Sequence, residues 1–184
     1  MNLDKPNILK ALERTGRLLD WPDPVEILLV GGAAGMTTGL FDETRNTQDC
    51  DVMCCVPSEA TNAIIEAATQ VAQEMSISRT WLNTQVQQLN ILPDGWHTRR
   101  QKVGDFGKLH IFAAGRLDLL AMKFYANRTI DREDIVMMKP RLDELAFVQT
   151  YLNMLRVPSR QADLDQVTAA LRRVRAMLAE VERG

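Results

Sequence analysis

The amino-acid sequence predicts an α+β fold with a mixed sheet flanked by helices and a helical C-terminal part. Segments typical of strands occur only in the first two thirds of the 184 residues, and everything after residue 116 has helical periodicity. The composition, 46% hydrophobic and 25% charged, is that of a globular protein with a real core. We expect a core over residues 1–115 and a helical part over residues 116–184 that packs on it as one compact unit.

The first three elements follow from apolar spacing and from breaker residues. Apolar residues recur at helical spacing over residues 3–20, and the Trp-Pro-Asp-Pro run that follows ends this helix. Residues 25–30 are β-branched and leucine residues that predict a strand. Gly31 and Gly32 then break the strand and open a short helix rich in alanine and methionine.

The remaining elements are expected in a regular order. A polar loop leads into a second strand, and proline, serine and glutamate then begin a convincing helix. A short helix and a hairpin come next, followed by helices alone. The expected ranges are a strand at 49–56, helices at 57–75 and 81–89, strands at 98–103 and 108–113, and helices at 116–127, 131–139, 141–155 and 163–182.

Two aspartates in the second strand are candidate metal ligands. Residues two apart in a strand point to the same face, so Asp49 and Asp51 share one face. Cys50, Val52 and Cys54 share the other, which is the natural core face. Two carboxylates with this spacing can both turn toward one Mg²⁺ or Mn²⁺ ion, whose remaining ligands are commonly substrate phosphates.

The glycine pair before them is a candidate phosphate contact. Glycine lets backbone approach a phosphate closely, and N–H groups at the start of a helix favour anions. The segment does not fit other phosphate loops, because Met36 stands where a P-loop has lysine and G-x-G-x-x-G is missing. The plain alternative is that Gly31 and Gly32 form a tight turn and that the aspartates are solvated charges at the edge of a strand.

The order of these residues resembles a known superfamily. A strand, Gly-Gly and a helix, followed by R-x-T-x-D-x-D at residues 45–51, resemble the polymerase-β-type nucleotidyltransferases. Trp-Leu-Asn at 81–83 and the K…R…D-x-x-D segment within 119–135 resemble bacterial members related to the AbiEii toxins of type IV toxin–antitoxin systems. The resemblance covers roughly residues 25–138 and implies a nucleotidyltransferase-like sheet.

The resemblance implies a role for each matching residue. The glycines and nearby polar residues would contact a nucleoside triphosphate (NTP), the two aspartates would hold Mg²⁺ or Mn²⁺, and the lysine would reach a phosphate. An aspartate of the last segment would orient the lysine or serve as a base. The implied catalytic residues are Asp49, Asp51, Lys123 and Asp134; the metal ligands are Asp49 and Asp51; the nucleotide-binding residues are Gly31, Gly32, Arg45, Thr47, Lys123, Arg128 and Asp131.

The later segment can also be read without the resemblance. On one unbroken helix, Lys123, Asn127 and Asp134 fall within about 40° of one another, because each residue turns the helix by about 100°. Alternatively, residues 128–130 end one helix and Asp131 caps the next. A structural Lys–Asp pair that joins two helices is the competing interpretation, and it is compatible with phosphate binding.

One departure from the superfamily concerns a third metal-binding carboxylate, which many members carry on a neighbouring strand. Here the candidate strand offers His110 where an acid is expected, and Asp105 stands in the preceding turn. Either Asp105 or a C-terminal aspartate completes the site, or the site binds one metal weakly.

Charge and cysteine content indicate the compartment and the partners. Three clustered cysteines form neither a disulfide framework nor a zinc spacing, and no apolar run approaches the roughly 20 residues of a membrane helix. We therefore expect a cytoplasmic protein without a membrane partner. The net charge of −2 gives no global attraction to nucleic acid, but the basic segment 98–102 can line a phosphate-rich groove.

The expected function is transfer of a nucleotidyl group from an NTP to a hydroxyl or phosphate. The acceptor is an RNA end such as that of tRNA, a protein or a small molecule. Two other functions stay open: a non-catalytic NTP-binding or protein-interaction module that kept the fold, and the toxin half of a toxin–antitoxin pair. The amphipathic last helix packs on the domain or contacts a second copy or a cognate antitoxin.

Overall fold

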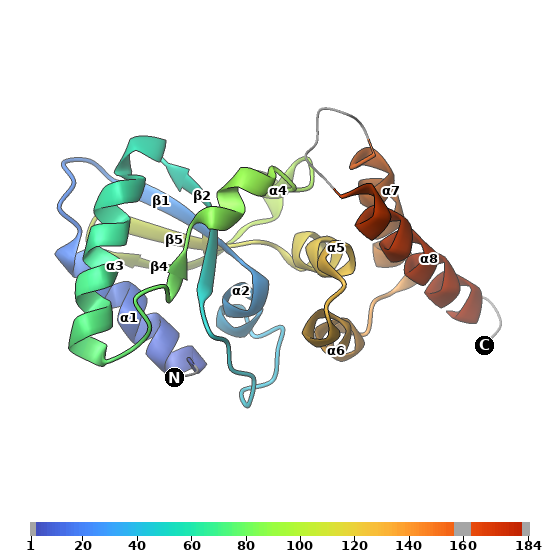
Figure 1. Cartoon of the computed structure of the whole chain (residues 1–184), viewed down its shortest axis with the longest axis horizontal. Coiled ribbons are helices and arrows are strands. Elements are labelled where there is room, and N and C mark those ends of the chain that lie inside the picture. Colours follow the sequence, from blue (N-terminus) through green and yellow to red (C-terminus); the bar gives the residue numbers. More distant parts are fainter. Residues whose placement is uncertain (1–2, 157–162, 182–184) are drawn as a thin grey trace. The chain divides into compact units, whose positions relative to one another are not determined.

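The computed structural model describes residues 3–156 and 163–181, and the contacts within the chain divide it into two compact units. The first, called the sheet unit, comprises Met1–Gln88 and Arg100–Ala114, and the second, the helical unit, comprises Leu89–Arg99 and Gly115–Gly184. The predicted α+β class is confirmed, because a mixed sheet with helices forms the sheet unit and α5 to α8 make up most of the helical unit (Figure 1).

A mixed sheet is the centre of the sheet unit. Within residues 3–156 and 163–181 it has five strands in the order β3-β2-β1-β5-β4. The central strand β1 is nearly all buried and pairs antiparallel with β2 and parallel with β5. A hairpin joins β4 to β5, and β3 lies parallel beside β2. The strands are β1 Val25–Val30, β2 Cys50–Val56, β3 Leu82–Asn83, β4 Gln101–Phe106 and β5 Leu109–Ala113.

Three α-helices accompany the sheet: α1 Lys5–Leu18, α2 Gly31–Thr37 and α3 Thr61–Met75, the last preceded by the 3₁₀ turn η1 Ser58–Ala60. Asp4 caps α1 by accepting a hydrogen bond from the Asn7 N–H at 2.9 Å. Helices α1 and α3 lie side by side, and α2 packs on β1, β2 and β5 (Figure 1). Helix α2 begins directly where β1 ends, as the glycine pair predicted.

The core face predicted for the second strand is wrong beyond Val52. Leu28 of β1 is paired with Cys54 and Leu29 with Val52, so Met53 is an extra residue in a β-bulge. The bulge reverses the alternation of faces along the rest of β2. As a result Cys55 is buried, and Cys54 is only partly buried.

Two further expectations need correction. The helix expected at 81–89 is instead β3 followed by the 3₁₀ turn η2 Gln85–Leu89, because the Trp81 carbonyl accepts from the Cys50 N–H and draws the segment into the sheet. The strand expected from residue 98 starts at Gln101, after a single helical turn, α4 Trp96–Arg99. Contacts with distant residues decide both segments, and local periodicity does not record such contacts.

The helical unit is organised around α5, which contacts α4, α6, α7 and α8. Its core is apolar, with Leu119, Leu120 and Phe124 of α5 fully buried. The Tyr151 hydroxyl of α7 donates to the Ile91 carbonyl at 2.7 Å, which ties the segment before α4 to the helices. Over residues 3–156 and 163–181, none of the helices combines the length and the apolar character needed to cross a membrane. The helices are α5 Arg116–Ala126, α6 Thr129–Met138, α7 Leu142–Met154 and α8 Leu164–Val181.

Candidate functional site

The glycine pair lies directly against the polar residues that follow it in the sequence. Gly31 has φ +66°, and a Cβ atom placed on it would stand 2.8 Å from Asp51 Oδ2. A Cβ on Gly32 would stand 3.0 Å from Thr47 Oγ1 and 3.6 Å from Arg45 Nη2. The sheet unit therefore brings five of the predicted residues together, and a Cβ on either glycine would press on the side chain beside it.

Backbone hydrogen bonds of Thr47 hold the loop that carries Arg45 and Thr47. Its backbone forms an isolated antiparallel bridge with Leu3, with hydrogen bonds of 2.7 Å and 3.0 Å. Its hydroxyl donates to the Asp49 carbonyl at 3.1 Å. The amino-terminal end of the described chain thus holds the loop between α2 and β2 next to Gly32.

The two aspartates flank a buried cysteine. Cys50 is 0% exposed, whereas Asp49 and Asp51 are partly exposed, so the carboxylates alternate with a core residue as predicted. Burial raises the pKa of the Cys50 thiol well above its usual range, and the charges of Asp49 and Asp51 raise it further. Cys50 is therefore a protonated core residue at neutral pH, and only the carboxylates are available as hard ligands.

The donor set fits one hard divalent ion that shares its coordination with a substrate. Among the described residues no group of three or more His, Cys, Asp or Glu side chains is arranged to hold a metal. One or two carboxylates are the ligand number with which proteins usually hold Mg²⁺, so Asp49 and Asp51 suit such an ion, and phosphate oxygens and water would supply its other ligands.

Asp105 and His110 lie too far from Asp51 to share a metal ion with it. In the sheet register Asp105 pairs with His110 and His110 with Glu26, whereas Asp51 pairs with Val30. Glu26 and Val30 are four residues apart, so at about 3.3 Å per residue they lie about 13 Å apart along β1. Asp105 instead bonds Lys102 at 2.6 Å and His110 Nδ1 at 2.7 Å, and these bonds lower the pKa of its carboxyl.

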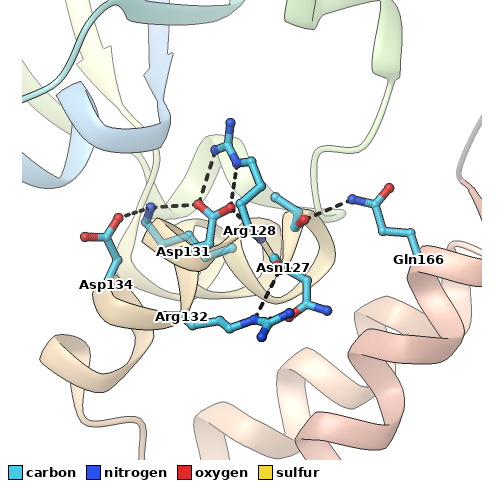
Figure 2. Close-up of polar contacts among 8 residues, drawn as sticks. Asn127, Arg128, Asp131, Arg132, Asp134 and Gln166 are labelled. Carbon is cyan, nitrogen blue, oxygen red and sulfur yellow. Dashed lines mark hydrogen bonds and ion pairs between the residues drawn. The ribbon is translucent and has the colours of Figure 1, made fainter.

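Lys123 belongs to a buried cluster in the helical unit, and Figure 2 labels Arg128, Asp131 and Asp134 of this cluster. Lys123 Nζ lies 2.5 Å from Asp134 Oδ2 and 3.3 Å from Asp131 Oδ1, and all three side chains are almost fully buried. Arg128 Nε bonds Asp131 Oδ2 at 2.7 Å. Burial alone would raise the pKa of Asp131, but the Arg128 hydrogen bonds and the Lys123 charge outweigh it and hold that pKa below its usual value.

A break between two helices, not one unbroken helix, gives this cluster its geometry. Helix α5 ends at Ala126, Asn127 takes the left-handed conformation at φ +51°, and α6 begins at Thr129. The Arg128 N–H donates to Asp131 Oδ2 at 3.1 Å, so Asp131 stabilises the start of α6 from within its first turn. The unbroken helix does not form. Two helices form, as the expected ranges 116–127 and 131–139 implied, but the break lies at Asn127 and Arg128 and not at residues 128–130. Asp131 is the third residue of α6, and Arg128 is its N-cap, so the expectation of Asp131 as the capping residue is wrong.

The basic segment predicted to line a groove is already charge-paired. Arg99 Nη2 lies 2.5 Å from Asp118 Oδ1, Arg100 Nη1 lies 2.6 Å from Glu26 Oε2, and Lys102 bonds Asp105. The Arg100 guanidinium also stacks 3.9 Å from the Phe112 ring centroid. The segment thus does not present a run of uncompensated cations.

Arg45 also borders a cavity of about 530 Å³ in the sheet unit. The cavity has both signs of charge on its walls, since Lys5, Arg45, Asp42 and Glu43 all line it. Its proximity to Gly32 through Arg45 makes it the hollow next to the glycine pair. The remaining lining residues are Met36, Gly39, Phe41 and Thr44.

One residue at the site was not among the predicted site residues. Asn83 of β3 donates from Nδ2 to Asp51 Oδ1 at 2.7 Å. The Trp-Leu-Asn motif was the only signal that pointed to it, because 32 residues separate Asn83 from Asp51.

Comparison with known proteins identifies the family of the chain. Residues 7–143 match the model of a family described as nucleotidyltransferase of unknown function (DUF6036). No curated protein and no solved structure gives a significant match to the chain. The matched region includes the glycine pair, both aspartates and the Lys123 cluster, and it spans well over half of the 184 residues. The chain therefore belongs to the DUF6036 family of nucleotidyltransferases.

Proposed function

We propose that the protein transfers a nucleotidyl group from an NTP to an acceptor and that Mg²⁺ or Mn²⁺ is its cofactor. The observation that carries this proposal is the contact of the glycine pair with Asp51 and Thr47. The partly exposed glycine backbone is suited to phosphate, and the Asp51 carboxylate beside it is suited to a divalent ion. Family membership supports the same reaction class.

The phosphate side of the site consists of backbone and of two side chains. Gly31 and Gly32 are partly exposed, Arg45 would supply a positive charge, and Thr47 would supply a hydroxyl. Helix α2 has only 7 residues, so its dipole adds little to the attraction of an anion. We propose that Arg45 and the glycine backbone hold the triphosphate and that Thr47 orients it.

On the metal side, Asp49 and Asp51 are the proposed ligands. A bound Mg²⁺ supplies charge neutralisation on the α-phosphoryl group and on the leaving pyrophosphate. The acceptor oxygen forms a bond to the α-phosphorus, the bond from that phosphorus to the bridging oxygen breaks, and pyrophosphate leaves with the electron pair. The hydroxyl proton of the acceptor passes to a base or to water. Asp49 and Asp51 hold the site in place, so that positioning accounts for most of the catalysis.

Lys123, Arg128 and Asp131 are proposed nucleotide-binding residues, and Asp134 is a proposed catalytic residue, on the resemblance of their segment to nucleotidyltransferases. In this proposal Lys123 holds a phosphate, and the two aspartates orient its ammonium group. Asp134, the nearer partner of Lys123, is the proposed base when the acceptor is a hydroxyl.

The experiment that tests the function is a calorimetric titration of each of the four NTPs, with Mg²⁺ or Mn²⁺, into the wild type and into Asp49→Asn/Asp51→Asn. We expect metal-dependent binding of at least one NTP and its loss in the double variant, with the circular-dichroism spectrum unchanged. An α-labelled NTP incubated with total RNA and with cell protein then reveals the acceptor. Absence of NTP binding by a folded wild type would contradict the proposal.

A second candidate function is binding of NTP without turnover. It is favoured by the small number of acidic ligands, since no group of three candidate metal-binding side chains exists among the described residues. Release of pyrophosphate distinguishes the two functions, because a binding module gives NTP affinity without pyrophosphate. Incorporation of label into an acceptor would exclude the binding module.

A toxin role is the more specific proposal that the AbiEii resemblance supports. As a toxin, the protein would modify an essential acceptor such as tRNA, and a cognate antitoxin would oppose it. Induced expression in a bacterial host measures this directly. Growth arrest by the wild type and none by Asp49→Asn/Asp51→Asn is the expected result, and normal growth with abundant folded wild type would contradict it.

A further inference from the structure

The two oxygens of the Asp51 carboxylate contact two different elements of the sheet unit. Oδ1 accepts a hydrogen bond from Asn83 Nδ2 at 2.7 Å, and Oδ2 is the atom that lies closest to the Cα substituent position of Gly31. Asp51 and Asn83 are directly in register in the parallel pair β2–β3. The orientation of this carboxylate therefore depends on a side chain of the neighbouring strand.

The Asn83 amide is itself held in one orientation. Its Oδ1 accepts from the Gln85 N–H at 3.0 Å, which leaves Nδ2 as the group that faces Asp51. A flipped amide would set an oxygen against the carboxylate and the NH₂ group against a backbone N–H, and both contacts would be repulsive.

Strand β3 is anchored at its start by Trp81. This side chain is 0% exposed, and its Nε1 donates to the Ala68 carbonyl of α3 at 2.9 Å. Its own carbonyl accepts from the Cys50 N–H at 2.5 Å, next to Asp51. These two hydrogen bonds of Trp81 hold the start of the two-residue strand in place. They thereby help to fix the position of Asn83, the second residue of β3.

We propose that Asn83 is a positioning residue of the metal site: it holds Asp51 so that Oδ2 is presented on the side of the glycine pair. The proposal rests on the function proposed above, in which Asp51 is a metal ligand. Hydrogen bonds that orient a ligating side chain are typically worth about 10–100-fold in metal affinity. A neutral amide also adds no negative charge, so the site attracts a metal that arrives with an NTP better than a metal alone.

Two substitutions separate this role from a role in the turn after β3. Asn83→Ala removes the bond to Asp51 and the bond to Gln85. Asn83→Asp keeps an acceptor for the Gln85 N–H but replaces the donor to Asp51 with a second carboxylate. Like charges this close are unfavourable until a cation lies between them. Asn62→Ala, on the exposed side of α3, is the control for the loss of an asparagine.

The measurement is Mn²⁺ binding, followed by electron paramagnetic resonance with and without a non-hydrolysable NTP, together with the melting temperature. We expect Asn83→Ala to bind Mn²⁺–NTP about ten-fold more weakly than the wild type. Asn83→Asp should melt at a lower temperature without metal, recover with Mn²⁺ alone, and bind Mn²⁺ alone more tightly than the wild type. Asn62→Ala should behave as the wild type.

The outcomes distinguish the two proposals. Wild-type binding of Mn²⁺–NTP with unchanged affinity in both Asn83 variants would overturn the positioning role and leave the proposed function standing. A folded wild type that binds no Mn²⁺–NTP would overturn both. If Asn83→Ala does not fold, the response of Asn83→Asp to Mn²⁺ decides, because a residue needed only for the turn gives no such response.

Discussion

At Gly31 the backbone conformation and the space above it both exclude a side chain. Its φ of +66° costs an alanine about 1 kcal/mol, and the new Cβ would stand 2.8 Å from Asp51 Oδ2. We expect Gly31→Ala to lower the free energy of unfolding by about 2–3 kcal/mol and to abolish metal-dependent NTP binding. Urea unfolding and calorimetry measure the two effects.

Gly39 offers the matched control for stability. It has φ +74°, and nothing lies within 4 Å of a Cβ placed on it. Gly39→Ala therefore tests the energy of a positive φ in alanine without a steric contact. Equal losses of unfolding free energy in the two variants would show that the contact with Asp51 does not constrain position 31.

Glu144 is a buried acid whose stabilising effect depends on pH. It accepts from Arg116 Nε at 2.7 Å and from the Arg141 N–H at 2.9 Å. The Arg116 hydrogen bonds, which outweigh the opposing effect of burial, hold the pKa of Glu144 below its usual value, with smaller contributions from Arg141. A lowered folded-state pKa gives stability that is complete above the unfolded-state pKa of about 4.3 and is lost as pH falls through the folded-state value.

Glu144→Gln should therefore cost about 2 kcal/mol at pH 7, and the difference from the wild type should shrink below about pH 4. Urea unfolding at pH 7, 5, 4 and 3 measures it. Glu133→Gln, an exposed acid on α6, serves as control and should change little at any of these pH values. A difference for Glu144→Gln that stays constant down to pH 3 would be evidence against the charged hydrogen bonds.

The site residues differ in how far the sequence reveals them. Gly31, Gly32 and the aspartates are predictable, because a break at the end of a strand and alternate acids are local patterns. Asn83 is not, because its contact with Asp51 follows from the pairing of β2 with β3, which local sequence does not encode. The bulge at Met53 is equally hidden, since it depends on the register with β1.

Between elements, Lys123 is the main polar link from α5 to α6. It lies within 3.3 Å of both Asp131 and Asp134, and none of the three is more than 4% exposed. Lys123→Met would leave two buried carboxylates without this cation, at a cost of about 3–5 kcal/mol. Adding Asp134→Asn should recover part of the loss, because one buried charge disappears.

A double-mutant cycle by urea unfolding tests this link. The three variants are Lys123→Met alone, Asp134→Asn alone and the two together. We expect the double variant to be more stable than Lys123→Met by at least about 1 kcal/mol. Simple additivity of the two losses would mean that the pair does not stabilise the α5–α6 turn.

Over whole elements, the sequence predicts long periodic segments and misses short ones. Strand β1 starts and ends where the apolar run does, and α7 and α8 lie within one or two residues of their expected bounds. Strand β3 has only 2 residues, too few for any periodicity, and contacts of the backbone with β2 create it. Helix α4 replaces the start of a strand because Arg99 turns toward Asp118 of α5.

At the level of the whole molecule, the two units are not consecutive in the chain. Residues 89–99 group with the later helices, through Tyr151 to Ile91 and through Arg99 to Asp118. Local sequence does not reveal this, because the partners lie 60 and 19 residues further along. The packing of residues 116–184 on residues 1–115 stays a prediction.

A fragment of residues 1–115 should therefore be defective within residues 89–99. Without the later helices, Arg99 loses Asp118 and the Ile91 carbonyl loses the Tyr151 hydroxyl. We expect rapid proteolysis in this segment of the fragment and slow proteolysis there in the full chain, detected by mass spectrometry of limited digests. Equal protection of residues 89–99 in both would contradict the grouping.

The bridge between Leu3 and Thr47 has a practical consequence for experiments. Tension applied ahead of Leu3, for example through an immobilisation linker, would act on the residue whose backbone fixes Thr47 beside Gly32. A surface-immobilised sample held by this end would then report a nucleotide affinity altered by its own attachment. Capture through an engineered cysteine on the exposed side of α3 leaves that bridge untouched.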